Sequence, residues 1–117
     1  MVEHSLAEIA RKYVESSNAH DLEAIEKMFL ENASYESAYV GRFEGWESIA
    51  VMMREFFERL PDVEWQVDGI NDVEVNVVEF PFVMRGTDSR SGERVERRGV
   101  ERIHFTDAGR ICHVEVR

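Results

Sequence analysis

The hydrophobic residues of this chain change their spacing about half-way along it. Through much of residues 4–60 they recur every three or four positions, and from residue 63 onward they alternate with polar residues. The first spacing is typical of amphipathic helices and the second of half-buried strands. A chain that makes helices first and neighbouring strands afterwards predicts an α+β fold, in which helices cover one face of a curved, mostly antiparallel sheet.

Local signals place the ends of these elements. Asp21 is expected to cap a second helix, and Pro61 cannot continue the third. Val77 and Val78 break the alternation of a long strand, which together with Pro81 indicates a bulge or an edge. The expected order is α-α-β-α-β-β-β-β, with helices at about 4–17, after Asp21 and at 45–60, and strands within 31–41, 62–69, 73–86, 94–105 and 110–117.

The segment "GVERIHF", residues 99–105, places a carboxylate among apolar residues. Strand side chains alternate between faces, so Glu101 shares a face with Ile103 and Phe105. A carboxyl on a dry face has a raised pKa and can donate a hydrogen bond while neutral. Two other placements stay open, because a bend at Gly99 would turn Glu101 outward and an arginine such as Arg97 or Arg85 would pair with it.

Length and charge restrict the class of protein. A chain of 117 residues forms a single domain, here residues 1–117, with one core. Its net charge of −10 argues against nucleic acid and anionic membranes as partners. No apolar run approaches the roughly 20 residues of a membrane helix, and the N-terminus lacks the pattern of a signal peptide, so a cytoplasmic protein is expected.

Three segments carry a family resemblance. Residues 11–36, "RKYVESSNAHDLEAIEKMFLENASYE", resemble the opening of ketosteroid isomerases and of the wider SnoaL-like, NTF2-like group. "GWESI" at 45–49 is similar to the start of the third helix in that group, and "HFTDAGRICHVEV" at 104–116 to its closing hairpin. The resemblance implies one SnoaL-like, NTF2-like (cystatin-like) cone, with three helices on the curved sheet and a mouth that suits a small molecule.

The resemblance also implies catalytic positions. Tyr13 matches the tyrosine that donates a hydrogen bond to a developing enolate, and Glu101 falls where the isomerases keep a protonated acid, as in the ketosteroid isomerase example of a neutral carboxyl donor. Ser37 stands where the isomerases have an aspartate base, and it cannot serve as one. In the polyketide-cyclase branch a single acid at the position of Glu101 acts as general acid and base. Tyr13 could instead be a core tyrosine, and Glu36 is expected on the face opposite Ser37.

These observations predict a cofactor-independent isomerase, cyclase or lyase that does acid–base chemistry next to a carbonyl of a small apolar or aromatic substrate. The alternative is a non-catalytic ligand-binding or dimerisation module of the same fold. No metal site is expected, because the four histidines lack ligand spacing, and no nucleotide or haem motif is present. The side chains expected to line a substrate pocket are Tyr35, Phe56, Trp65, Phe82, Met84, Ile103 and Val114.

The outer face of the last strands predicts a homodimer. If Cys112 points inward as a small core residue, the alternation sends Ile111 and His113 outward, beside Arg102 and His104. Apolar and aromatic residues among charges are typical of an interface, and a two-fold dimer is the commonest closed assembly. We therefore expect two copies to pair through this face.

Overall fold

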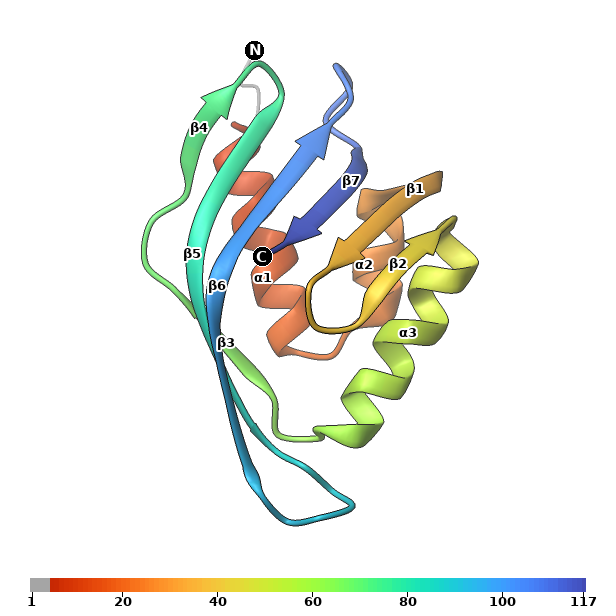
Figure 1. Cartoon of the computed structure of the whole chain (residues 1–117). Coiled ribbons are helices and arrows are strands. Elements are labelled where there is room, and N and C mark those ends of the chain that lie inside the picture. Colours follow the sequence, from red (N-terminus) through yellow and green to blue (C-terminus); the bar gives the residue numbers. More distant parts are fainter. Residues whose placement is uncertain (1–4) are drawn as a thin grey trace.

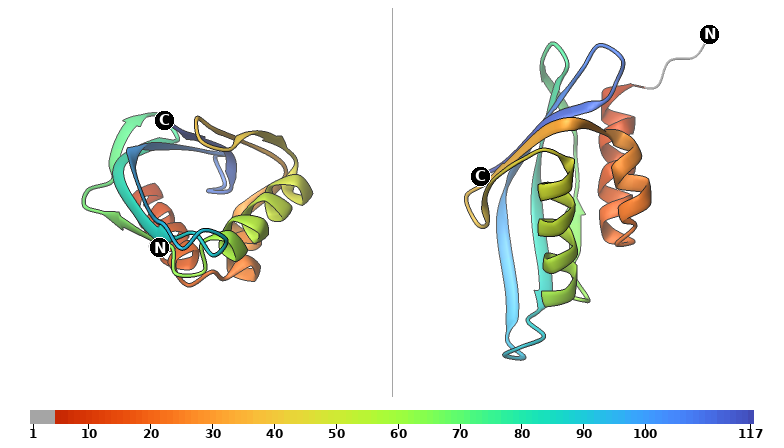
Figure 2. Two further views of the ribbon diagram at one scale, coloured as in Figure 1. Left: turned by 60° about the horizontal axis from the view of Figure 1, so that its bottom comes forward. Right: turned by 90° about the vertical axis from the view of Figure 1, so that its right-hand side faces the viewer.

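The computed structural model describes residues 5–117, and the expected helix start at residue 4 lies outside them. Three helices lie against the concave side of one strongly curved sheet (Figures 1 and 2). The α+β class and the order of helices and strands are confirmed. The elements are α1 (Leu6–Asn18), α2 (Leu22–Met28), β1 (Phe29–Ser37), β2 (Gly41–Glu44), α3 (Trp46–Arg59), β3 (Glu64–Val67), β4 (Asn71–Glu74), β5 (Val77–Thr87), β6 (Arg94–Phe105) and β7 (Ile111–Val116).

The sheet places its first strand next to its last strand. Its strand order is β2-β1-β7-β6-β5-β3, and β4 pairs separately with β5. Every pairing is antiparallel except that of β1 with β7. The last strand therefore lies between the first strand and the long β5–β6 hairpin, and the sheet curves around the helices (Figure 2). This curl leaves an enclosed space between the sheet and the helices.

The helix starts follow their capping residues. The side chain of Asp21 accepts a hydrogen bond from the backbone N–H of Ala24 at 3.1 Å, as expected of an N-cap. Ser5 caps α1 in the same way. The chain enters α3 through Gly45, whose φ of 86° lies in the region that favours glycine. The three helices are thus fixed by local signals that are visible in the sequence.

Two of the expected strands are hairpins. Residues 31–41 divide into the end of β1 and the start of β2, and residues 73–86 divide into β4 and β5 around Asn76. Asn76 adopts a φ of 60°, and its side chain donates a hydrogen bond to Asp107 at 2.6 Å. The valines continue to alternate through this turn, so their spacing alone does not reveal the turn. Val75, which lies in the turn, is 89% exposed.

Pro81 lies where one side of β5 is unpaired. The β4 ladder ends at Glu79 and the β3 ladder begins at Phe82, so Pro81 falls between them. A proline has no N–H to donate and is tolerated at such a local edge. The β4–β5 ladder also changes register between Asp72 and Glu74. The irregularity expected near Val77 and Pro81 is therefore present in both forms, as a register shift and as a local edge.

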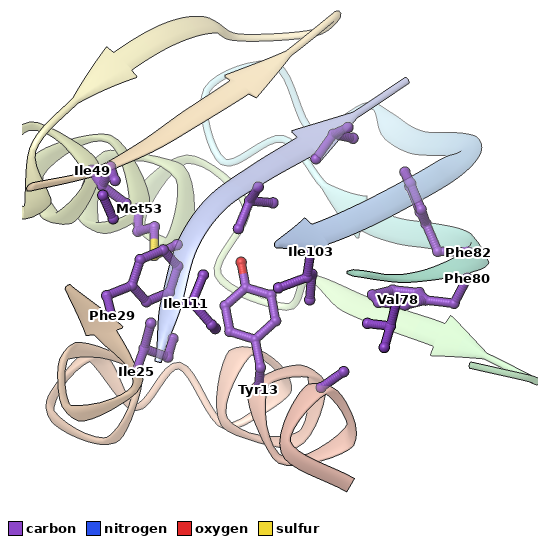
Figure 3. Close-up of a cluster of buried hydrophobic side chains, with 14 of the residues drawn as sticks. Tyr13, Ile25, Phe29, Ile49, Met53, Val78, Phe80, Phe82, Ile103 and Ile111 are labelled. Atoms are coloured by element: carbon purple, nitrogen blue, oxygen red, sulfur yellow. The ribbon is translucent and has the colours of Figure 1, made fainter. Parts of the chain in front are cut away.

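The core joins both halves of the chain. Ile25 of α2, Ile49 of α3, and Phe80 and Ile103 of the sheet are at most 1% exposed (Figure 3). Gly99 of β6 is required by close packing, because a Cβ there would collide with the backbone oxygen of Arg117. The strand continues through Gly99 and pairs on both sides of it, so no bend there turns the following residues outward.

The expected direction of Ile111 is wrong. In the β6–β7 ladder His104 pairs with His113 and Phe105 pairs with Ile111, which leaves Cys112 as an extra residue on β7. A one-residue bulge reverses the alternation beyond it. Ile111 is therefore fully buried in the core, while half-buried Cys112 donates its S–H to the carbonyl of His104.

Candidate active site

A cavity opens between the helices and the concave face of the sheet. Its volume is about 730 Å³, which includes open space at the mouth. Aromatic and aliphatic side chains form most of its wall. Those that the sequence also indicated are Tyr13, Tyr35, Phe56, Trp65, Phe82 and Met84.

Three polar side chains from three elements meet in this cavity. Tyr13 comes from α1, Tyr35 from β1 and Glu101 from β6. Tyr13 is 5% exposed and Glu101 6% exposed, and Tyr35 is partly buried against the core. Figure 3 shows the Tyr13 hydroxyl pointing away from α1 toward the sheet. The site therefore holds one carboxyl and two phenols in an apolar enclosure.

The register of the sheet turns Glu101 inward. Glu101 pairs with Phe80 on β5 and with Val116 on β7, and both of these side chains are buried. Within residues 5–117 no hydrogen bond or ion pair joins the Glu101 carboxyl to another side chain, and Arg85 pairs with Glu96 instead at 2.9 Å. Both alternative placements of Glu101, outward at Gly99 or paired with an arginine, are therefore wrong.

Burial shifts the titration of all three groups. It raises the pKa of Glu101 from 4.5 to about 8. It also raises the pKa of Tyr35 and of Tyr13, and the negative charge of an ionised Glu101 adds to both effects. Interaction with the Ser17 hydroxyl, one turn further along α1, partly opposes the shift at Tyr13. At neutral pH the site thus presents three O–H donors, because the carboxyl and both phenols hold their protons.

Ser37 lines the cavity, but its side chain is a hydroxyl and not the carboxylate that the isomerases have at this position. It is 8% exposed, and its Oγ accepts a hydrogen bond from the backbone N–H of Tyr39 at 3.0 Å. The neighbouring Glu36 points to the opposite face, where Arg42 binds it at 3.0 Å. A serine hydroxyl without an adjacent base does not remove a proton from carbon. The alternation therefore placed these two residues correctly.

Ile103 and Val114 do not line the cavity, contrary to expectation. They pair with each other across β6 and β7, and Ile103 also pairs with Val78 on β5. All three side chains are fully buried. They belong to the packed core and not to the cavity wall. Their inward direction was predictable, but the depth to which the cavity reaches depends on the tertiary packing.

Arg97 and Tyr39 also line the cavity, although neither was among the expected lining residues. Arg97 shares its strand face with Glu101, and the alternation that placed Glu101 could have placed Arg97 as well. Tyr39 lies in the turn between β1 and β2, where no periodic signal predicts a side chain's direction. Within residues 5–117 no three histidine, cysteine or carboxylate side chains are placed to hold a metal ion.

The comparisons with known proteins agree with this architecture. The model of the SnoaL-like domain matches residues 10–114, so the chain belongs to the SnoaL-like family. No curated protein matches the chain. None of the helices in residues 5–117 combines the length and the apolar character needed to cross a membrane.

Solved structures share the fold at low sequence identity. An uncharacterized cystatin-fold protein from Novosphingobium aromaticivorans superposes with a TM-score of 0.87 at 18% identity, covering 98% of this chain and 99% of its own. SalBIII, an epoxide hydrolase/cyclase-like enzyme of pyran ring formation in the polyether salinomycin, has a TM-score of 0.85 at 22% identity over 95% and 88%. A SnoaL-like protein of unknown function from Burkholderia thailandensis has 0.77 at 22% over 100% and 98%.

The buried carboxyl predicts a specific dependence of stability on pH. In the unfolded chain Glu101 loses its proton near pH 4.5, whereas in the folded chain it holds the proton until about pH 8. The folded state therefore binds more protons between these values, and the free energy of unfolding falls as pH rises from 4.5 to 8, by on the order of 4 kcal/mol. Urea unfolding of Glu101→Gln should lack this loss, because glutamine stays neutral.

Glu36→Gln is the matched control, since the Glu36 carboxylate is exposed and paired with Arg42. This variant should keep the pH dependence of the wild type. Parallel stability curves for Glu101→Gln and wild type between pH 5 and 8 would contradict the burial of a protonated carboxyl.

Proposed function

We propose that this protein is a cofactor-independent enzyme that moves a proton next to a carbonyl of a small apolar or aromatic substrate, as an isomerase, cyclase or lyase. The observation that carries the proposal is the meeting of one buried, unpaired carboxyl with one buried and one partly buried phenol in an apolar cavity. Perturbed titrating groups that converge in a pocket are typical of acid–base sites. Membership of the SnoaL-like family supports the same class of chemistry.

Glu101 is the acid and base of this proposal. With a pKa of about 8, about one molecule in ten is ionised at pH 7, and the fraction rises as pH increases. The ionised carboxylate takes a proton from the carbon next to the substrate carbonyl, and the electron pair moves to the carbonyl oxygen. The protonated Glu101 then returns the proton to another atom of the substrate. No second carboxylate is needed, which fits the serine at position 37.

Tyr13 and Tyr35 stabilise the oxygen that gains negative charge. Their hydroxyl groups remain protonated throughout the physiological range, since burial raises both pKa values. Hydrogen bonds that are already aimed at a developing oxyanion in a dry cavity lower the barrier more than equivalent bonds in water. The aromatic walls formed by Phe56, Trp65 and Phe82 would contact the apolar body of the substrate.

Hydrogen–deuterium exchange at carbon tests the proposed function. A panel of aryl and cyclic ketones is incubated with the protein in deuterated water, and loss of the proton next to the carbonyl is followed by NMR. The rate should rise with pH to a plateau above about 8 as Glu101 ionises. Glu101→Gln should lower it about 100-fold or more, and Tyr13→Phe by roughly tenfold.

Glu36→Gln should exchange at the wild-type rate, because its carboxylate lies outside the cavity. Exchange that is unaffected by Glu101→Gln would contradict the role of Glu101. Ketones that bind the wild type without any exchange would instead support a non-catalytic ligand-binding module.

We also propose that two copies pair through the outer face of β6 and β7. His104 and His113 lie side by side there, with ring centroids 5.2 Å apart, and Glu115 contacts both. Each of these three side chains is 30% exposed or less. The burial of Ile111 removes it from the proposed contact. Val100 lies two positions from Arg102 on the outer face of β6, so it is the apolar residue to change.

Sedimentation should show a dimer of the 13.6 kDa chain at micromolar concentration, and Val100→Glu should give a folded monomer. Val51→Glu, on helix α3 at the concave side of the sheet and 49% exposed, should leave the dimer intact. A monomeric wild type, or a folded Val100→Glu dimer, would contradict this interface.

A further inference from the structure

One positive charge faces the cavity. Arg97 pairs with Met84 on β5, and the Met84 side chain is only 3% exposed. The Arg97 side chain therefore also projects from the inner, concave face of the sheet. Arg97 lines the same cavity as Glu101. The rest of the cavity wall is almost entirely apolar or aromatic, and the chain as a whole carries a net charge of −10. The Arg97 guanidinium is therefore a positive charge in a mostly apolar cavity.

Two aromatic rings hold the Arg97 guanidinium in place. Its central carbon lies 4.8 Å from the ring centroid of Tyr39 and 5.9 Å from that of Phe56, both within the range of cation–π contacts. The Tyr39 hydroxyl donates a hydrogen bond to the backbone carbonyl of Arg98 at 3.0 Å, which fixes that ring against β6. The side chain is thus positioned before any ligand arrives.

The guanidinium of Arg97 has no anionic partner in residues 5–117. Other arginines of the sheet are paired: Arg85 with Glu96 and Arg102 with Glu79, each at 2.9 Å. Arg97 forms no ion pair or hydrogen bond with any described side chain, and its contacts are the two rings. Its N–H donors are free to bind an anion at the cavity.

We propose that Arg97 binds a carboxylate group of the ligand, so that the natural ligands of this cavity are apolar or aromatic acids. A planar carboxylate matches the paired N–H groups of a guanidinium. The inference rests on the proposed function only for the other end of the ligand, where a carbonyl meets Glu101.

The spacing on β6 sets the size of such a ligand. Positions 97 and 101 share one face of an extended strand, so their Cα atoms are about 13 Å apart, and the long arginine side chain shortens that gap. A ring system or short chain with a carbonyl at one end and a carboxylate at the other spans it. The apolar wall between them, including Phe56 and Phe82, covers the body of the molecule.

Isothermal titration with a matched pair of ligands tests the proposal. The probes are naphthoylvalerate, an aryl ketone with a terminal carboxylate, and its uncharged methyl ester. The wild type should bind the carboxylate about tenfold or more tightly than the ester, which is the scale of a hydrogen bond to a charged group. Arg97→Met keeps an unbranched apolar stem against the two rings and should bind both probes equally, with ester affinity unchanged.

Arg98→Met is the matched control. It removes the same charge one residue away, on the exposed side of the strand, where Arg98 pairs with Glu96. This variant should keep the preference for the carboxylate, and Arg97→Lys should keep part of it. Equal binding of both probes by the wild type, no binding of either at millimolar concentration, or an equal loss of preference in Arg98→Met would overturn the proposal.

Glu101→Gln separates this proposal from the proposed function. It removes the acid–base group and leaves Arg97 in place, so it should retain the carboxylate preference while losing exchange at carbon. If the wild type prefers the carboxylate but shows no exchange at carbon, the role of Arg97 in binding is supported and the proposed function is not. If exchange depends on Glu101 but the wild type binds the carboxylate and the ester equally, only the role of Arg97 in binding is refuted.

Discussion

The carboxyl group of Glu101 lies in an apolar enclosure without a charged partner, and the chemistry of the cavity depends on this desolvation. A carboxyl in water would be ionised at neutral pH, and as a carboxylate it could donate no hydrogen bond and would accept those of the phenols in place of a ligand oxygen. Burial instead keeps it protonated up to about pH 8. The same burial holds Tyr13 and Tyr35 in their neutral forms, so one physical cause prepares three donors.

The fold provides this enclosure through its connectivity. The final strand pairs in parallel with β1 and antiparallel with β6, which brings Tyr35 and Glu101 onto one continuous concave face. Helix α1 then covers that face and adds Tyr13. Next to these site residues, Ile103 and Val114 pair with each other and are fully buried. The domain thus has a packed core that stabilises it beside a cavity that can admit a ligand.

Period-two alternation was sufficient to predict the direction of side chains along uninterrupted strands. It placed Glu101 inward and Glu36 outward, and both directions are confirmed. It failed for Ile111, because the extra residue Cys112 reverses the alternation and no local signal in the sequence marks that bulge. It also could not show that a turn interrupts the valines around Asn76, since their spacing continues through it.

The candidate site was predictable in part for the same reasons. The resemblance identifies Tyr13, Glu101 and Ser37 as candidate site positions, and the structure brings all three to one cavity. Which apolar residues line that cavity depends on how closely the helices approach the sheet, a property of the whole packed domain. Arg97 was within reach of the alternation, but an arginine on an apolar face is a rare arrangement, and its role depends on rings contributed by other elements.

Titration of the Glu101 side chain itself shows whether burial keeps this carboxyl protonated. Carbon-13 labelling of the glutamate carboxyl carbons, with assignment by the Glu101→Gln variant, allows its chemical shift to be followed from pH 4 to 10. We predict a transition with a pKa of about 8. A transition near the ordinary value of 4.5 would show an ionised, solvated carboxylate at neutral pH and would contradict the desolvation of Glu101 on which the proposed chemistry depends.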